Sequence, residues 1–162
     1  MKKLFLLPLC FAMLLISCQT VVDFDSEKAL VSESLNQWIS AQQNENVDMI
    51  EKILCDDPDM IIFGTDAQER MMGKDEFIAA QKKFFEETSE SKIEVYKTMI
   101  KLCRSGNVAW TSCLLNWDIL SAGQPIHMEG LRLTSVFEKR DNKWLVVQGH
   151  VSVPVSGQAV AY

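Results

Sequence analysis

The spacing of hydrophobic and polar residues differs between the two halves of the chain. Up to about residue 87, apolar residues recur every three or four positions, which is typical of helices with one buried face. Ser26 is a candidate cap for the first helix, and Gln42 and Gln81 fall on apolar stripes. A short apolar run at residues 60–64 has the composition of a buried strand. The pattern predicts three helices, at residues 26–42, 47–57 and 74–87.

From residue 92 onward, apolar residues alternate with polar ones, which is the period of a half-buried strand. Short connectors with turn-forming residues separate four long segments of this kind, so the segments predict an antiparallel meander. Helices gathered on one face of such a sheet make an α+β fold, and long strands must twist and curve. The curved sheet would leave a cavity at one end. The predicted strands span residues 92–103, 108–120, 125–139 and 143–153.

The first residues have the organisation of an export signal. Two lysines precede an apolar run at residues 4–16, which is shorter than the roughly 20 residues of a membrane-spanning helix. The run ends in Leu15-Ile16-Ser17-Cys18, which resembles the bacterial lipobox, in which the cysteine is lipidated and becomes the first mature residue. A plain signal peptide is the alternative. We therefore divide the chain into a lipoprotein signal (1–17), a lipidated tether (18–26), one folded domain (27–155) and a tail (156–162).

The net negative charge of the mature chain excludes some classes of binding partner. The full chain carries 16 basic and 22 acidic residues, and its net charge is −6. Removing residues 1–17 takes away two lysines and no acid, so 14 basic and 22 acidic residues remain, a net charge of −8. Such a chain is a poor nucleic-acid binder, and we expect the lipid on Cys18 alone to hold it to a membrane. Gln19 resembles an outer-membrane address in a Gram-negative cell, so the predicted location is the bacterial cell envelope.

The cysteines predict neither a disulfide framework nor a metal site. Without Cys10 and the lipidated Cys18, three cysteines remain, an odd number. Cys103 and Cys113 flank a predicted turn and could pair, although buried free thiols are the more common outcome in apolar strands. The sequence contains no CxxC motif and no Cys/His cluster, so we predict no metal and no cofactor.

The last two predicted strands carry a motif. Residues 130–152 read Gly-x-Arg-x-Thr, a charged turn, Lys-Trp, and a closing His-x-Ser. This pattern resembles SnoaL-like domains of the nuclear-transport-factor-2-like (NTF2-like) superfamily, and residues 64–77 are similar to the family's strand, loop and helix. The resemblance implies an α+β cone, in which three N-terminal helices pack on a strongly curved antiparallel sheet of one short and four long strands. It also implies a small-ligand cavity and, commonly, a homodimer formed through the sheet.

Candidate ligand-binding residues follow from the strands and from the resemblance. Simple alternation places His150 and Ser152 on one face with Val146, and the resemblance implies that this face is the cavity. The resemblance also turns Arg132, with Thr134 in phase, into the cone, where a buried guanidinium needs an anion. The alternatives are a solvated Arg132 and a structural His150. Two further candidates are Trp117, as an apolar wall, and Tyr96, as a hydrogen-bond donor.

No complete catalytic constellation emerges from the sequence. Isomerase chemistry of the ketosteroid type needs a tyrosine, a protonated acid and a separate aspartate base, and this chain offers only Asp66 and Asp118. His150 is the remaining acid–base candidate. We therefore predict a lipid-anchored protein that binds a small, anionic or polar-headed ligand. The alternatives are an isomerase, cyclase or dehydratase that uses His150, and a dimerising interaction module.

Overall fold

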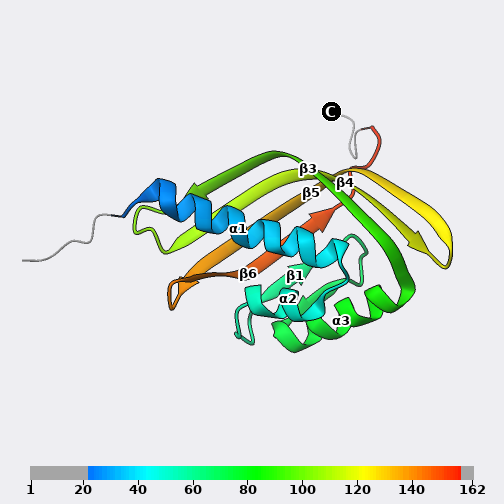
Figure 1. The fold of residues 1–162 in the computed structure, drawn as a ribbon, viewed down its shortest axis with the longest axis horizontal. Helices are drawn as coiled ribbons and strands as arrows, with labels where there is room; N and C mark the ends of the chain where they lie inside the picture. The colour runs from blue at the N-terminus through cyan, green and yellow to red at the C-terminus, as the bar shows by residue number, and fades with distance from the viewer. Residues whose placement is uncertain (1–21, 158–162) are drawn as a thin grey trace, which may run out of the picture.

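A computed structural model describes residues 22–157 as three helices and one sheet of six strands (Figure 1). The sheet order is β2-β1-β6-β5-β4-β3. The helices are α1 (Phe24–Gln43), α2 (Val47–Ile53) and α3 (Gly73–Glu87). The strands are β1 (Ile61–Phe63), β2 (Arg70–Met72), β3 (Thr88–Leu102), β4 (Val108–Ser121), β5 (Gln124–Arg140) and β6 (Lys143–Ser152).

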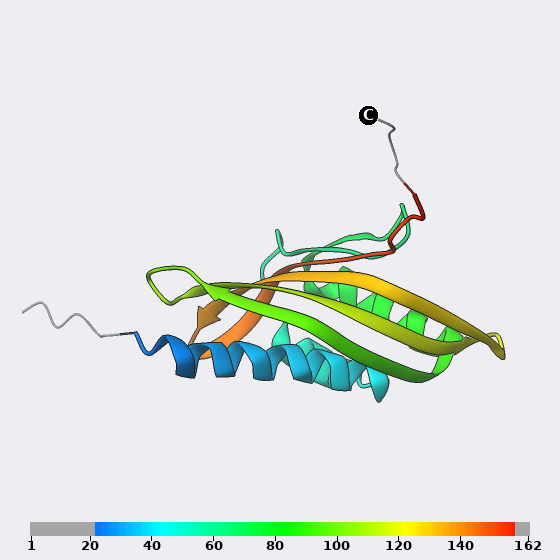
Figure 2. The same cartoon turned by 90° about the horizontal axis from the view of Figure 1, so that it is seen from above.

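Strands β3 to β6 form the predicted antiparallel meander, and the short strands extend it at one edge. Strand β1 pairs with β6 in parallel, so the sheet is mixed rather than purely antiparallel. Strand β2 pairs with β1 in the segment expected to be a loop. The long strands bend together, and α1 runs along the hollow side of the sheet (Figure 2). The α+β cone is therefore confirmed, with one more short strand than predicted.

Helix α1 begins earlier than the sequence pattern indicates. The carboxylate of Asp23 accepts hydrogen bonds from the backbone N–H groups of Asp25 and Ser26, each at 3.2 Å, and so caps the helix. Ser26 is therefore not the cap, and residues 24–26 belong to the helix rather than to a tether. The signal, Cys18 and the tether up to residue 21 lie outside the described residues. Among the described helices, none is long and apolar enough to cross a membrane.

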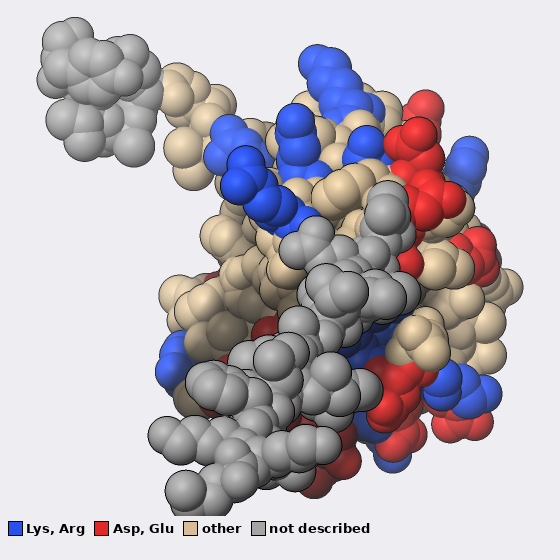
Figure 3. Space-filling view, turned by 90° about the vertical axis from the view of Figure 1, so that its left-hand side faces the viewer, with Lys and Arg blue, Asp and Glu red and all other residues tan. Residues whose placement is uncertain are grey.

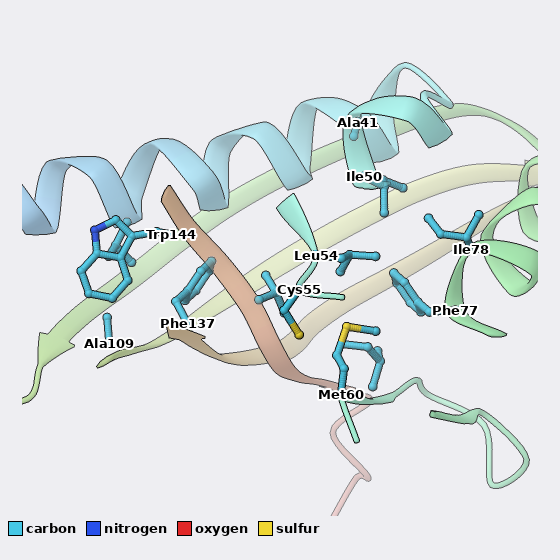
Figure 4. Packing of buried hydrophobic residues seen from close by; sticks show 13 residues of the cluster. Ala41, Ile50, Leu54, Cys55, Met60, Phe77, Ile78, Ala109, Phe137 and Trp144 are labelled. Carbon is cyan, nitrogen blue, oxygen red and sulfur yellow. The ribbon is translucent and has the colours of Figure 1, made fainter. Parts of the chain in front are cut away.

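The buried side chains form two clusters on the hollow side of the sheet. The first joins all three helices to β5 and β6 through residues such as Ile50, Phe137 and Trp144 (Figure 4). The second lines β4 and β5 around Leu115 and Leu131, both fully buried. Helix α1 is tied to the sheet by the Ser34 hydroxyl, which donates to the Trp144 carbonyl, and by packing of its apolar face. The two clusters leave a space between them, which is described below.

Two β-bulges decide which side chains face that space. In β5, residues 129–130 lie opposite the single residue Asn116 of β4, and Gly130 takes a positive φ of 67°. In β6, Val147 is the extra residue between the pairs Val136–Gln148 and Phe137–Val146. A bulge inserts one residue and reverses the alternation beyond it. Simple alternation therefore fails at both places.

The three described cysteines are free thiols, so no disulfide joins Cys103 to Cys113. Cys113 lies on the buried face of β4, whereas Cys103 lies in the turn between β3 and β4. Burial raises the pKa of the Cys113 thiol to about 11. Hydrogen bonding by the Ser105 side chain and by backbone groups of the turn lowers the pKa of Cys103 to about 7. The two thiols of one hairpin therefore have opposite chemical character.

Candidate functional site: an apolar cavity

A cavity of about 260 Å³ lies between α1, α3 and the hollow face of the sheet. Both core clusters contribute to its walls: Leu54, Phe77 and Phe137 come from the first, and Leu35, Ile119 and Leu133 from the second. Its volume is slightly below the roughly 300–1,000 Å³ found for ligand pockets. The cavity therefore has room for a small molecule and offers it mainly hydrocarbon surface.

One wall is an aromatic group built from three elements. The Trp117 ring of β4 meets Trp38 of α1 edge-on at 6.3 Å between centroids, and Phe84 of α3 at 5.6 Å. The Trp117 indole N–H donates to the Ser91 hydroxyl at 2.9 Å. This hydrogen bond satisfies the only polar atom of the ring, so the remaining indole surface is free to contact apolar groups.

Few polar side chains reach the interior of the cavity. Gln42 at the end of α1 is 1% exposed, and Ser135 of β5 is 7% exposed. The Gln42 Nε2 donates to Oε1 of Gln81, which lies on α3, while the Gln42 Oε1 has no hydrogen-bond partner among the described residues. The interior polar groups are therefore amides and a hydroxyl, which are neutral.

The mouth of the cavity is marked by the lining residues that are exposed. They come from β1 and the loop after it, from the start of β5 and from the end of β6: Phe63, Thr65, Glu69, Ile126 and His150. The Glu69 carboxylate accepts from the backbone N–H of Asp66 at 2.9 Å. A Cβ on Gly64 would lie 2.2 Å from Glu69 Oε2, so only glycine lets this side chain fold back over the loop.

Charge at the site is restricted to the mouth. Among the described lining residues there is no lysine or arginine, and Glu69 is the only carboxylate. Neither Glu69 nor His150 is buried, so no ionisable side chain lies inside the cavity. This follows from the cost of placing a charge in apolar surroundings without a partner. The arrangement suits a neutral molecule.

Sequence comparison assigns the domain to a family. Residues 31–156 match the sequence model of the SnoaL-like domain. The chain belongs to the SnoaL-like family. A comparison with curated protein sequences finds no match.

Solved structures share the fold of this SnoaL-like domain at low sequence identity. An NTF2-like superfamily protein from Salmonella enterica is 16% identical, with a TM-score of 0.76 over 86% of this chain and 99% of that one. A ketosteroid isomerase-like protein from Erwinia carotovora is 15% identical, with a TM-score of 0.68 over 82% and 99% of the two chains. A candidate dehydratase of the NTF2-like family from Streptomyces avermitilis is 11% identical, with a TM-score of 0.71 over 82% and 99%. At such identities, the likeness concerns the fold.

Arg132 does not point into the cavity of this SnoaL-like domain. It is exposed, lies between the buried Leu131 and Leu133, and is paired across the sheet with Leu114 and Ser152. The expectation of a cavity-facing guanidinium is therefore wrong, and Arg132 cannot pair with an anion inside the cavity. The bulge at Gly130 is the reason that Arg132 shares the outer face with His127, although the two are an odd number of residues apart.

Tyr96, Thr134 and Ser152 are also on the outer face. Tyr96 and Arg132 both pair with Leu114, and Ser152 pairs with Arg132. Thr134 lies two residues beyond Arg132, so all of these side chains lie on the same face of the sheet. The Tyr96 hydroxyl donates to the Asn116 side-chain oxygen at 3.4 Å, beside the bulge rather than in the cavity. None of the three lines the cavity, whereas Trp117 lies in its wall.

His150 lies at the rim. It is exposed, and its ring meets the Phe63 ring edge-on at 5.9 Å. Val146 is buried, so the two residues do not share a face as predicted, because the bulge at Val147 separates them. Gln148, His150 and Ser152 do stay in phase.

The two aspartate candidates are distant from the interior. Asp66 is exposed in the loop after β1, and its Oδ1 accepts from the backbone N–H of Gln68 at 3.2 Å. Asp118 is on the outer face, where it accepts from the His127 ring at 2.5 Å and raises the pKa of that histidine. Neither lines the cavity. The described lining of the cavity therefore contains no pair of acidic and basic side chains of the kind that ketosteroid-type isomerase chemistry needs.

The sequence interpretation passed over Gln42, Gln81, Ser135 and Glu69. A signal for two of them was present, because Gln42 and Gln81 occupy apolar positions of their helical stripes. A polar residue on a buried helical face needs a partner, and here the two are partners of one another. Which residues of α1 and α3 meet is a tertiary fact that the separate stripes do not contain.

Proposed function

We propose that this SnoaL-like protein binds a small, neutral, largely apolar molecule and holds it unchanged. The observation that carries the proposal is the apolar cavity of about 260 Å³ with no ionisable side chain inside. A reaction by general acid–base catalysis needs a titrating group within hydrogen-bond reach of the substrate. His150 at the rim is the only imidazole that lines the cavity among the described residues, and its ring meets Phe63 edge-on.

We further propose that a lipid on Cys18 anchors the protein in a bacterial cell envelope, at the outer membrane in a Gram-negative cell. The described chain starts at Val22, and a Cβ on Gly106 in the β3–β4 turn would lie 2.4 Å from the Val22 side chain. Figure 3 looks at this end and shows Lys and Arg side chains beside it. Ile126 pairs with Ile119 beside the β4–β5 turn, at the opposite end of the long strands, whereas His150 pairs with Thr134 near the middle of β5. An anchor attached through residue 18 would join the described chain at the end of the long strands opposite Ile126, which is one side of the cavity mouth.

The cavity proposal is tested by filling the cavity from α3. Ala80 lines the cavity, whereas its neighbour Ala79 is exposed and does not. In a thermal-shift screen of neutral aromatic and alicyclic compounds, hits should stabilise the wild-type protein and the Ala79→Phe control. Ala80→Phe should abolish the stabilisation, because the new ring occupies the ligand volume. Stabilisation that survives Ala80→Phe would place the binding elsewhere.

A homodimer through the outer sheet face is the second candidate. Trp110 of β4 is 45% exposed and Met99 of β3 is 47% exposed. Met99 pairs with Ser112, which places Met99 diagonally beside Trp110 on one face. Two large apolar side chains exposed together favour a covered surface. Sedimentation velocity should show a dimer that Trp110→Glu converts to a monomer, and a monomeric wild-type protein would exclude this candidate.

A further inference from the structure

The amide pair of Gln42 and Gln81 is the most unusual polar feature of the cavity. Gln42 sits in the last turn of α1, which is fastened to the sheet because the backbone N–H of Ile93 donates to Gln43 Oε1 at 2.8 Å. The Gln42 side chain is 1% exposed and lines the cavity. Its Nε2 donates to Gln81, and its Oε1 has no partner among the described residues. One half of a rigidly placed amide is therefore unused.

The unused half does not depend on how the pair is arranged. A single hydrogen bond joins the two amides, whichever of them donates it, so one polar atom of Gln42 is always left over. A buried polar atom without a partner is costly, and apolar residues of similar shape would avoid the cost. Gln81 is only partly buried and can turn toward solvent, whereas Gln42 cannot. A partner for Gln42 has to come from within the cavity.

We propose that Gln42 is the polar anchor of the ligand, and that the ligand is a neutral, mostly apolar molecule with a hydroxyl group. A hydroxyl both donates and accepts, so it satisfies either end of the amide. The aromatic wall of Trp38, Phe84 and Trp117 would hold the apolar body of the molecule. This inference rests on the proposed function and adds the chemical class of ligand and the residue that selects it.

The same geometry argues against an anionic ligand. No lysine or arginine among the described residues lines the cavity, and the Glu69 carboxylate stands at its mouth. An anion would have to enter past a like charge and lose its hydration without gaining a cationic partner. A carboxylate of the same shape should therefore bind worse than the alcohol.

Three probes of one shape test the inference: 2-naphthol, 2-methylnaphthalene and 2-naphthoate. Their affinities are measured by calorimetry with the full mature protein, Gln42→Met, Gln81→Met and the control Gln37→Met. Gln37 lies on the same helix but bonds to Glu33 and does not line the cavity. We expect wild type and Gln37→Met to bind 2-naphthol about three- to tenfold more tightly than 2-methylnaphthalene, the difference that one hydrogen bond makes. Naphthoate should bind weakest.

The preference for the hydroxyl should disappear in Gln42→Met and persist at least in part in Gln81→Met, with no loss of thermal stability in ligand-free Gln42→Met. A stability loss in that variant with an unchanged preference would assign Gln42 a purely structural role and overturn the inference. Equal binding of the alcohol and the hydrocarbon by the wild type would also overturn it, while leaving the apolar cavity as a binding site. If no probe binds, the proposed function fails, and the inference with it.

Discussion

On β5, Leu131, Leu133 and Ser135 face the helices, while Arg132 and Thr134 face solvent. The two faces of this strand share a backbone and differ in what their polar groups can do. Around the cavity the inner face keeps only neutral polar groups, because a charge there would lose its hydration without a partner. The outer face carries Arg132 and His127, and His150 lies at the cavity rim. These are residue types that a sequence pattern readily suggests as site residues. Residue type alone is therefore a poor guide to the site in this fold.

The β3–β4 hairpin shows the same difference between a solvent-exposed and a buried environment, in the pKa values of its two cysteines. A hydrogen-bonded thiol at the hairpin turn is activated, whereas the thiol on the inner face of the same hairpin is suppressed. Burial on the inner face opposes ionisation of the Cys113 thiol, for the same reason that the cavity wall carries no buried charge. Four predictions test how sharply the two environments differ.

The largest difference is expected in thiol reactivity. At pH 7 about half of Cys103 is thiolate, because its pKa is about 7, whereas Cys113 with a pKa of about 11 is almost wholly protonated. Iodoacetamide should therefore modify Cys103 more than about a thousandfold faster than Cys113. The rate at Cys103 should rise with pH through about 7 and then level off. Peptide mass mapping over time measures both sites, and comparable rates would mean that the inner face is open to solvent.

The two faces of β5 should respond differently to truncation of neighbouring residues. Leu131 is 0% exposed, so Leu131→Ala should lower the free energy of unfolding by about 2–5 kcal/mol through cavity creation. Arg132→Ala removes an exposed side chain and should change it by no more than about 0.5 kcal/mol. Urea denaturation of both variants checks this. A large loss in Arg132→Ala would show that the outer face is covered, for example by a second copy.

A third effect concerns the one carboxylate that joins α1 to the inner face. Glu27 accepts from the Trp144 indole N–H at 2.9 Å and from Lys139 at 2.5 Å. Glu27→Ala leaves the buried indole N–H without a partner and should cost about 1–3 kcal/mol of unfolding free energy. Glu27→Gln should retain much of this stability, since its amide oxygen can still accept from the indole.

The pH dependence of this contact has a definite sign. The hydrogen bond from Lys139 holds the pKa of the Glu27 carboxyl below its ordinary value. The stabilisation is therefore complete above the ordinary glutamate pKa of about 4.3 and is lost as pH falls through the lower folded pKa. Glu27→Gln should flatten the acid limb of stability below about pH 4.3. An unchanged acid limb would mean that other carboxylates dominate it.

The smallest effect is expected for the ion pair of the outer face. Asp118 raises the pKa of His127, so any stabilisation is present below the ordinary histidine pKa and is lost as pH rises through the folded value. The side chains are 60% and 52% exposed, and solvent screens them. Asp118→Asn should lower the His127 pKa, as followed by NMR titration, without a measurable change in unfolding temperature. A clear destabilisation would show a buried role for the pair.

The sequence predicted the elements of this fold closely because each local period of apolar residues reflects burial of one face. The four long strands and three helices lie within a few residues of their predicted positions. The exceptions are informative. Strand β2 has three residues and no alternating pattern of its own, so it exists through pairing with β1. Asp23 is the cap instead of Ser26, because residues of both types cap helices and only the backbone geometry chooses between two candidates three positions apart.

The site was harder to predict, because the face of the sheet on which a strand side chain lies is inferred by counting residues along the strand. A bulge adds a residue and changes that count. Gly130 takes a positive φ, as glycines in bulges often do, but a glycine in a strand is not enough to predict a bulge. Val147 gives no signal at all, since a β-branched residue is ordinary in a strand. Across the bulge at Val147 the parity argument placed His150 with Val146, and the structure separates them.

By itself, then, the sequence determined the α+β fold class, the order of its elements and the apolar stripes that must be buried, because these depend on local periodicity and turn chemistry. The motif at residues 130–152 added the resemblance to the SnoaL-like family. Only the tertiary structure decided which polar residues face the cavity. It turned Arg132 outward, left His150 at the rim and brought Gln42 against Gln81 across two helices. The physical reason is that a strand's register and two helices' approach are set by packing of the whole core, which no single segment contains.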